Sequence, residues 1–238
     1  MIKIAAIIPA YNEENSIANV VNDIISQNKK TNYRVDPIVV NDSSKDNTKK
    51  IIEKLDCVAL NLPINLGIGG AVQTGYKYAF INGYDYAIQV DGDGQHPACE
   101  IQNLVDEILV SENDIIIGSR FISKEGFQSS FIRRQGINYF KWLNNFLLGI
   151  KITDSTSGFR LLNKKALKLV VNYYPDEYPE PESIILFSLN KLKIKEVPVK
   201  MIERQGGVSS INTLSSIYYM LKVTLAIIFT YIRIKFKK

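Results

Sequence analysis

The chain has 238 residues, enough for one large α/β domain with a small appendage, and its 46% hydrophobic and 22% charged residues are typical of a globular protein. Its 29 Lys and Arg residues outnumber its 24 Asp and Glu residues, and the net charge of +5 favours an anionic partner, either a phosphate-bearing substrate or an anionic membrane. No motif supports nucleic acid as a partner. Cys57 and Cys99 show neither Cys-x-x-Cys nor zinc-ligand spacing, which argues against a disulfide framework and makes a reducing cytosol the expected compartment.

Strand and helix patterns alternate through the first half of the chain, as in βαβ units with a mostly parallel sheet. The first apolar run, 2–9, ends in a proline and lacks the cleavage site of a signal peptide, so we expect a buried strand. A helix with an apolar stripe over 17–25 follows, and then a second strand (33–40), a second helix that residues 43–46 cap and that ends at Leu55, and a third strand (57–62).

A glycine turn, Asn65-Leu66-Gly67-Ile68-Gly69-Gly70-Ala71, leads from the third strand into a helix that ends near residue 82. The turn resembles half of a dinucleotide fingerprint, but Val72 takes the place of the third glycine. Close approach of the backbone to a ligand or to a neighbouring strand explains these glycines equally well.

Two carboxylates separated by one glycine come directly after the apolar strand 86–90, in the motif Asp91-Gly92-Asp93-Gly94-Gln95-His96. Ligands of open α/β sheets bind beyond the carboxyl ends of the strands, and two such carboxylates can reach one hard cation. The alternative is a solvated Asp-Gly turn without a ligand. An EF-hand calcium loop fits less well, because His96 and Gln102 occupy the positions of its glycine and its bidentate acid.

The second half continues the α/β pattern. Pro97 starts a helix, the strand 114–118 delivers Arg120, and Arg133 with Arg134 precedes an aromatic-rich helix over 139–148. The paired arginines either bind a phosphate or lie at the start of a helix without a ligand.

A polar cluster closes on an arginine, Thr153-Asp154-Ser155-Thr156-Ser157-Gly158-Phe159-Arg160, and a helix over 164–171 follows it. The acidic stretch 178–182 is expected to be a rigid connector into another helix, and 195–204 an edge or return strand. The next segment, 204–210, is rich in backbone and side-chain donors that suit a diphosphate.

The end of the chain, 214–238, is apolar and closes on Arg233, Lys235, Lys237 and Lys238. Its uninterrupted apolar run, 223–232, is half of the roughly 20 residues that a spanning helix needs. An amphipathic helix in the membrane interface, with its basic end on anionic headgroups, is therefore expected; the alternative is a helix packed on the core with a solvated tail.

Five motifs in order resemble family-two glycosyltransferases, and in particular the dolichol-phosphate mannose synthase and polyprenyl-phosphate glucosyltransferase branch. The motifs are Pro9-Ala10-Tyr11-Asn12-Glu13-Glu14, Asn41-Asp42-Ser43-Ser44-Lys45-Asp46-Asn47-Thr48, Asn65-x-Gly67-x-Gly69, Asp91-Gly92-Asp93-Gly94-Gln95-His96 and Ser157-Gly158-Phe159-Arg160. The resemblance covers about residues 2–210. It implies a GT-A fold, which is Rossmann-like with a mostly parallel sheet flanked by helices, over 1–211, followed by the interface helix over 212–238.

The resemblance also implies a nucleotide-sugar donor linked to UDP or GDP, a divalent cation (Mg²⁺ or Mn²⁺) and roles for individual residues. The nucleotide sugar is assigned to Pro9, Tyr11, Glu13, Asn41, Asp42, Gly69, Asp91, Arg204 and Ser209, and the metal to Asp91, Asp93 and Gln95. The acceptor phosphate is assigned to Arg120 and Arg133, and catalysis to Asp93, Asp154 and Arg120. Asn41 replaces the first acid of the usual Asp-Asp pair, so the choice between uridine and guanosine stays open, and Ile137 stands where a serine is common four residues after Arg133.

The chemistry of the acceptor points in the same direction. A sugar hydroxyl must lose a proton as it attacks, whereas a lipid phosphate is already anionic at neutral pH. The single histidine, His96, adjoins the acidic motif and is interpreted as structural. We therefore expect inverting transfer of a hexose to a polyprenyl phosphate by a protein attached peripherally to the cytoplasmic face of the membrane, alone or with a small membrane protein or a second copy of the chain.

Three alternatives remain. A family-two transferase could extend a polysaccharide by attack of a sugar hydroxyl, with Asp154 or Glu182 as base. A membrane-associated module could bind nucleotide without catalysis. A sugar-1-phosphate nucleotidyltransferase fits least, because Tyr11-Asn12-Glu13 stands where its glycine-rich basic signature belongs.

Overall fold

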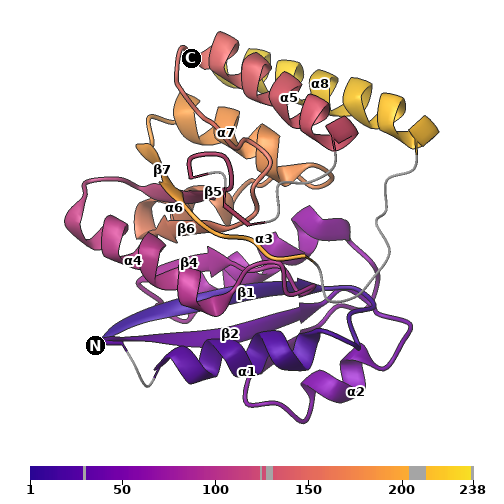
Figure 1. The fold of residues 1–238 in the computed structure, drawn as a ribbon, viewed down its shortest axis with the longest axis vertical. Coiled ribbons are helices and arrows are strands. Elements are labelled where there is room, and N and C mark those ends of the chain that lie inside the picture. Colours follow the sequence, from indigo (N-terminus) through magenta and orange to yellow (C-terminus); the bar gives the residue numbers. More distant parts are fainter. Residues whose placement is uncertain (29–30, 124, 127–130, 204–212, 237–238) are drawn as a thin grey trace.

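A sheet of seven strands forms the centre of the molecule in the computed structural model, which describes residues 1–238 except 29–30, 124, 127–130, 204–212 and 237–238. The strands are β1 (Ile2–Ala10), β2 (Tyr33–Asn41), β3 (Val58–Asn61), β4 (Tyr86–Gln89), β5 (Ile115–Ser119), β6 (Arg160–Asn163) and β7 (Ile194–Pro198). Their order is β3-β2-β1-β4-β6-β5-β7 (Figure 1). All neighbours pair in parallel except β6, which is antiparallel to both β4 and β5.

Helices cover both faces of the sheet because its central strands are apolar on both sides. The helices are α1 (Ile17–Gln27), α2 (Thr48–Ile52), α3 (Gly67–Ile81), α4 (Ile101–Val110) after the short 3₁₀ turn η2 (Ala98–Glu100), α5 (Phe131–Leu148), α6 (Lys164–Val170), α7 (Pro179–Leu189) and α8 (Thr213–Lys235). One core cluster lies between the sheet and α1 and α4, and a second between the sheet and α3, α6 and α7. The arrangement is the α/β GT-A architecture that the motifs predict.

A third, smaller cluster joins α5, α7 and α8. It contains Phe140, Leu143, Ile185, Val223 and Ile227. Tyr139 Oη of α5 lies 3.1 Å from Thr224 Oγ1 of α8, and Thr230 of α8 donates to Glu182 of α7 at 2.6 Å. The helices α5 and α8 therefore lie side by side over α7, on the opposite side from α1 and α2 (Figure 1).

Four sequence-based boundaries are wrong. The aromatic-rich helix begins at Phe131, so Arg133 and Arg134 lie in its first turn and do not precede it. In the segment predicted as a connector, 178–182, Tyr178 is the N-cap of α7 and the other residues already belong to the helix. Pro179 and Pro181 lie in its first turn, where the missing N–H groups need no intrahelical acceptor. The second helix is confined to Thr48–Ile52, and β7 ends at Pro198.

The strand β6 was not predicted. It has only four residues, begins at the last residue of the polar cluster 153–160 and runs directly into α6. Its insertion between β4 and β5 places Arg160 at the carboxyl ends of these two strands, where the acidic motif follows β4.

Candidate active site

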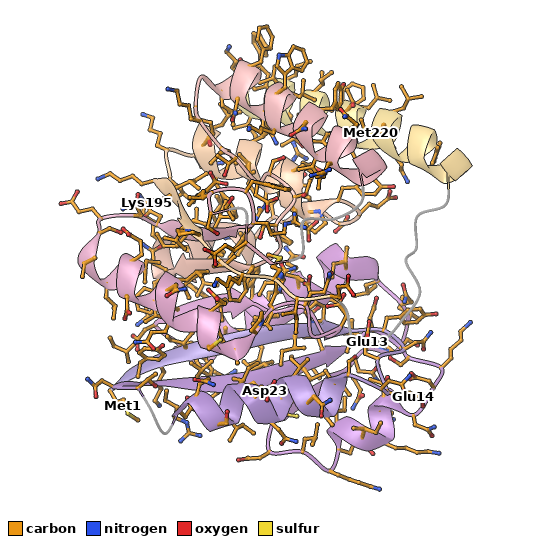
Figure 2. All side chains as sticks on the ribbon, in the orientation of Figure 1. Met1, Glu13, Glu14, Asp23, Lys195 and Met220 are labelled. Atoms are coloured by element: carbon orange, nitrogen blue, oxygen red, sulfur yellow. The ribbon has the colours of Figure 1, made fainter. Side chains whose placement is uncertain are left out.

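Three loops meet at one edge of the sheet because β1, β2 and β4 are parallel neighbours. In the register, Ala10 of β1 lies opposite Asn41 of β2, and Ile7 lies opposite Gln89 of β4. The residues after each strand, Tyr11, Asp42 and Asp91, therefore share the carboxyl edge, as the motifs predict. Figure 2 shows the Glu13 and Glu14 side chains at this edge.

The loops after β1 and β2 are joined by direct hydrogen bonds. Asn12, whose φ of 58° lies in the left-handed region, donates its N–H to Ser44 Oγ at 3.0 Å and accepts the N–H of Lys45 at 2.8 Å. Glu13 donates its N–H to Thr48 Oγ1 at 2.8 Å. These bonds hold the loops after β1 and β2 together. Tyr11, at the same edge, is 43% exposed to solvent.

Asp42 caps the helix α3. Its carboxylate accepts the N–H groups of Leu66 and Gly67 at 2.7 and 2.9 Å, two donors that the helix itself leaves unsatisfied. The neighbouring Asn41 donates its side-chain NH₂ to Asn61 Oδ1 at 2.8 Å. Both predicted nucleotide contacts are buried, and their side chains already have protein partners.

Gly69 has a structural explanation. A Cβ at this position would lie 2.1 Å from the carbonyl oxygen of Pro175 and 2.2 Å from that of Asp176, and its own N–H donates to the oxygen of Asp176 at 2.9 Å. Of the two explanations for the glycine turn, close approach of a backbone segment accounts for this glycine.

The acidic motif forms a tight turn against the end of β1. A Cβ on Gly92 would lie 2.9 Å from the carbonyl oxygen of Pro9. Asp93 is buried, and its Oδ1 accepts the N–H of Gln95 at 3.0 Å, while the Asp91 side chain remains 35% exposed. His96 Nδ1 accepts the N–H of Asp91 at 3.1 Å, which supports the structural interpretation of this histidine.

The Ser157–Arg160 motif packs against this acidic turn. Phe159 stacks on His96 with ring centroids 4.8 Å apart, and a Cβ on Gly158 would lie 3.3 Å from Asp91 Oδ1. Arg160 is buried and donates to Ser157 O, Ser183 Oγ and Ser155 O. The motif therefore connects the acidic turn to the start of α7.

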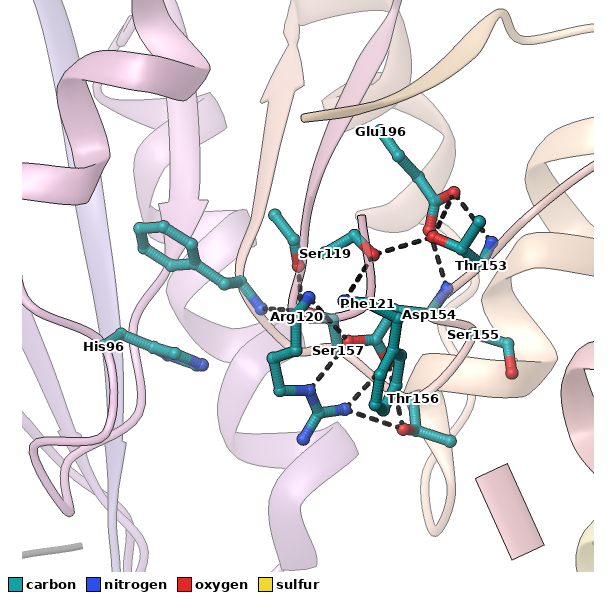
Figure 3. A network of polar contacts seen from close by, with 12 residues as sticks. His96, Ser119, Arg120, Phe121, Thr153, Asp154, Ser155, Thr156, Ser157 and Glu196 are labelled. Atoms are coloured by element: carbon teal, nitrogen blue, oxygen red, sulfur yellow. Dashed lines mark hydrogen bonds and ion pairs between the residues drawn. The ribbon is translucent and has the colours of Figure 1, made fainter. Parts of the chain in front are cut away.

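Arg120 and Asp154, both predicted catalytic residues, are bonded to each other (Figure 3). Arg120 Nε and Nη2 donate to the two oxygens of Asp154, each at 2.7 Å, and Nη2 also donates to Thr156 Oγ1 at 3.0 Å. Asp154 has no exposed surface. Burial alone would lower the pKa of Arg120, but the hydrogen bonds and charge of Asp154, together with the charges of Asp91 and Glu180, outweigh burial and raise the pKa.

Glu196, on β7, holds the segment that carries Asp154. Its carboxylate accepts the N–H of Thr153 and the N–H of Asp154, each at 2.7 Å, and the Thr153 hydroxyl at 2.9 Å. The Thr153 hydroxyl also lies 2.7 Å from Ser119 Oγ, next to Arg120 (Figure 3).

Sequence reasoning missed Glu180 as a candidate functional residue. It lies in the first turn of α7, and its pKa is raised, chiefly by burial and further by the charge of Asp91, against the opposing effect of Arg160. An acidic residue beside a helix-starting proline was the available signal. Glu182, the alternative base, instead accepts the hydroxyls of Thr230 and Tyr173 at 2.6 and 3.3 Å and is buried beneath α8.

Other predicted site residues are placed less fully. Gln95 donates its amide to the oxygen of Ile202 at 3.5 Å. Arg133 lies in α5, and its side chain is outside the described ones; Arg204 and Ser209 fall wholly outside the described residues.

The sheet order, the hydrogen-bonded loops and the acidic turn define a GT-A fold. Among solved structures, glucosyl-3-phosphoglycerate synthase from Mycobacterium tuberculosis matches with a TM-score of 0.69 at 17% identity, over 98% of this chain and 79% of that one. Mannosyl-3-phosphoglycerate synthase from Rubrobacter xylanophilus matches with a TM-score of 0.73 at 14% identity, over 94% and 73%. The family model for glycosyl transferase family 2 matches residues 5–170, and the chain belongs to this family.

Among the sequence relatives that cover most of the chain, two are named for prenol-linked sugar products or acceptors. The UDP-N-acetylglucosamine--dolichyl-phosphate N-acetylglucosaminyltransferase of Methanococcus voltae is 36% identical over 217 residues, 82% of this chain and 84% of that protein. The polyprenol monophosphomannose synthase of Mycolicibacterium smegmatis is 27% identical over 218 residues, 87% of this chain and 80% of that protein. In the part of the chain that the structure describes, no helix is both long and apolar enough to cross a bilayer.

Proposed function

We propose that the protein transfers a hexose or N-acetylhexosamine, with inversion, from a nucleotide sugar to a polyprenyl phosphate at the cytoplasmic membrane face. The Methanococcus voltae relative is named for a dolichyl-phosphate acceptor and the Mycolicibacterium smegmatis relative for a polyprenol monophosphomannose product, and both names support the acceptor class. A UDP-linked donor is the first to test, because the Methanococcus voltae relative is named for one.

The pairing of Arg120 with Asp154 is the observation that carries the proposal. A hydroxyl acceptor needs a base at the site, and the two candidates from the sequence are engaged elsewhere: Asp154 is fully buried against Arg120, and Glu182 is bonded to Thr230. A phosphate acceptor needs no base. It needs a cation, and Arg120 is an oriented guanidinium at the same edge as Asp91.

The acidic turn suits a divalent cation of the Mg²⁺ or Mn²⁺ kind. Such ions take hard oxygen ligands, and Mg²⁺ is often held by only one or two carboxylates together with substrate phosphates. No group of three or more His, Cys, Asp or Glu side chains converges among the described residues, so a pair of carboxylates that relies on the diphosphate matches the site. Asp91, with Asp93 and Gln95 beside it, would hold the ion, which would neutralise the departing nucleoside diphosphate.

The α5–α8 face would contact the membrane. On α8, apolar side chains at helical spacing are exposed, namely Tyr218, Leu221, Leu225, Phe229 and Ile232, and Phe236 directly after the helix is exposed as well. On α5, Trp142 and Phe146 stack at 5.6 Å and are 58% and 71% exposed. The exposed stripe of α8 is distinct from the face that packs on α7, so α8 is apolar on two sides. An exposed aromatic and aliphatic surface with Arg233 and Lys235 at its end is typical of interfacial attachment to anionic lipid.

Glu180 supports a second candidate, transfer to a sugar hydroxyl. Glu180 lies in the first turn of α7, the helix in which Ser183 accepts a hydrogen bond from Arg160 of the motif beside the acidic turn, and burial raises the pKa of the Glu180 carboxyl. A carboxyl in this position is suited to act as a general base. Glu180→Gln separates the two candidates: transfer to a hydroxyl would be lost, whereas transfer to a phosphate would continue because the acceptor carries no proton to remove.

The test is a transfer assay with labelled UDP- and GDP-sugars, Mg²⁺ or Mn²⁺ and undecaprenyl phosphate in detergent, beside Asp93→Asn. Label in an acid-labile lipid product with the wild type, and none with Asp93→Asn, supports the proposal. Label that remains in water as free sugar contradicts the acceptor assignment, and no consumption of any donor favours a binding module without catalysis. Matched wild-type and Asp93→Asn unfolding curves would show that the variant is folded.

A further inference from the structure

The contacts around Arg120 extend past its partner to the edge strand β7. We propose that Glu196 is a positioning residue, which holds Asp154 in place and, through Asp154, sets the orientation of the Arg120 guanidinium. The inference rests on the proposed function, in which Arg120 binds the acceptor phosphate.

The position of Glu196 is set by strand pairing. It lies opposite Ile117 in the parallel register of β5 and β7. Its Oε2 accepts the N–H and hydroxyl of Thr153 at 2.7 and 2.9 Å, and its Oε1 accepts the N–H of Asp154 at 2.7 Å. The segment 151–159 between α5 and β6 contains no helix or strand, so these bonds satisfy backbone donors that no ladder satisfies. Glu196 therefore holds Thr153 and Asp154, while Asn145 and Arg160 hold residues on either side of them.

Asp154, held in this way, orients the Arg120 side chain. Both of its oxygens meet the guanidinium at 2.7 Å, and Oδ2 also accepts the N–H of Arg120 at 3.3 Å. A bidentate pair fixes the plane of a guanidinium as well as its position, and so sets the direction of the Nη1 group, which does not face Asp154. A displacement of about 1 Å at a positioning group can reduce a reaction rate by about 10²-fold.

Glu196→Gln tests the proposal, because it keeps the size of the side chain and turns one acceptor oxygen into an NH₂ group that faces N–H donors. The KM for undecaprenyl phosphate should rise about tenfold or more, and Arg120→Lys should raise it in the same way, while the KM for the nucleotide sugar changes less than about twofold in both variants. The matched control is Glu112→Gln. Glu112 pairs with Lys193, directly before β7, and its side chain is 91% exposed. The control should change neither KM.

A measurement without substrate separates failure of this proposal from failure of the proposed function. The Nε–H and Nη–H NMR signals of Arg120 should be separate and slow to exchange in the wild type, broadened in Glu196→Gln and unchanged in Glu112→Gln. If the wild type labels no polyprenyl phosphate but Glu196→Gln broadens these signals, the positioning role stands and the proposed function fails.

Unchanged Arg120 signals together with an unchanged acceptor KM, in a Glu196→Gln protein that unfolds cooperatively, would overturn the positioning role. If Glu196→Gln does not fold, Thr153→Val removes only the hydroxyl that joins Glu196 to Ser119. A smaller change of the same kind is then expected, and its absence also overturns the proposal.

Discussion

Replacement of Asp154 by Asn should destabilise the protein strongly. Asp154 has no exposed surface and Arg120 is 9% exposed, so water screens the pair little. The Asn side chain offers one acceptor oxygen to the two donors of Arg120 and turns its NH₂ group toward the other, leaving a buried guanidinium without its countercharge. Removal of one partner of a buried ion pair typically costs about 3 to 5 kcal/mol. For a chain of this size, that corresponds to a fall in Tm of about 6 to 20 °C.

The assay is thermal and urea unfolding, with Asp85→Asn as the matched control. Asp85 pairs with Lys164 at 3.0 Å, but their side chains are 39% and 62% exposed, so the control should cost less than about 1 kcal/mol. The double variant Arg120→Met/Asp154→Leu removes both charges, and it should recover most of the lost stability while remaining inactive, because well-packed apolar residues often replace a buried ion pair at little cost.

Two results would refute this reasoning. One is an Asp154→Asn protein that unfolds within about 1 kcal/mol of the wild type, since a buried pair should exceed the limit for a surface pair. The other is a double variant as unstable as the single one, which would show that the loss comes from repacking and not from an unpaired charge.

Three further predictions concern stability and attachment. Burial raises the pKa of Glu182, although the hydrogen bonds from Thr230 and Tyr173 lower it. The contribution of Glu182 to stability is therefore full below the ordinary pKa of a glutamate and is lost as pH rises through the folded-state pKa. Glu182→Gln should flatten this part of a curve of Tm against pH measured from about pH 4 to 8, and a variant curve parallel to that of the wild type would contradict the assignment. Gly69→Ala should lower the free energy of unfolding in urea by about 1 to 3 kcal/mol or more, because the new Cβ meets backbone oxygens. This loss should exceed that of Gly67→Ala, where φ is +78° but nothing lies within 4 Å of the new Cβ. Equal losses would mean that the contact at Gly69 relaxes freely. Phe146→Glu with Phe229→Glu should abolish cosedimentation with vesicles that contain anionic lipid, whereas Val110→Glu, 84% exposed on α4, should not; equal binding by all three proteins would exclude the α5–α8 face.

Local sequence signals were sufficient for the part of the site that lies on consecutive parallel strands. Runs such as 2–9 and 33–40 are apolar and β-prone, and residues that follow parallel strands must reach the same edge of a sheet. The shared edge of Tyr11, Asp42 and Asp91 could therefore be predicted without coordinates. The structural role of His96 was also accessible, because it adjoins the acidic turn in the chain.

The helix starts at Phe131 and Pro179 were misjudged for a physical reason. Prolines and arginines occur both in loops and in the first turn of a helix. A proline is tolerated in the first turn because the first four N–H groups of a helix have no intrahelical partner. Packing of α5 and α7 against α8 decides the outcome, and no short window of sequence contains that information.

By itself, the sequence determined the class of fold, the acidic turn at a strand end and the family motifs, because these depend on local periodicity and on residues adjacent in the chain. Only the tertiary structure decided which charges pair. Arg120 and Asp154 are 34 residues apart, and they meet because β6 runs antiparallel between β4 and β5, so that the segment before β6 lies beside the end of β5. The sequence supplies the charged groups, but the distances that make Asp154 a partner of Arg120 and not an exposed base come from the order of the strands.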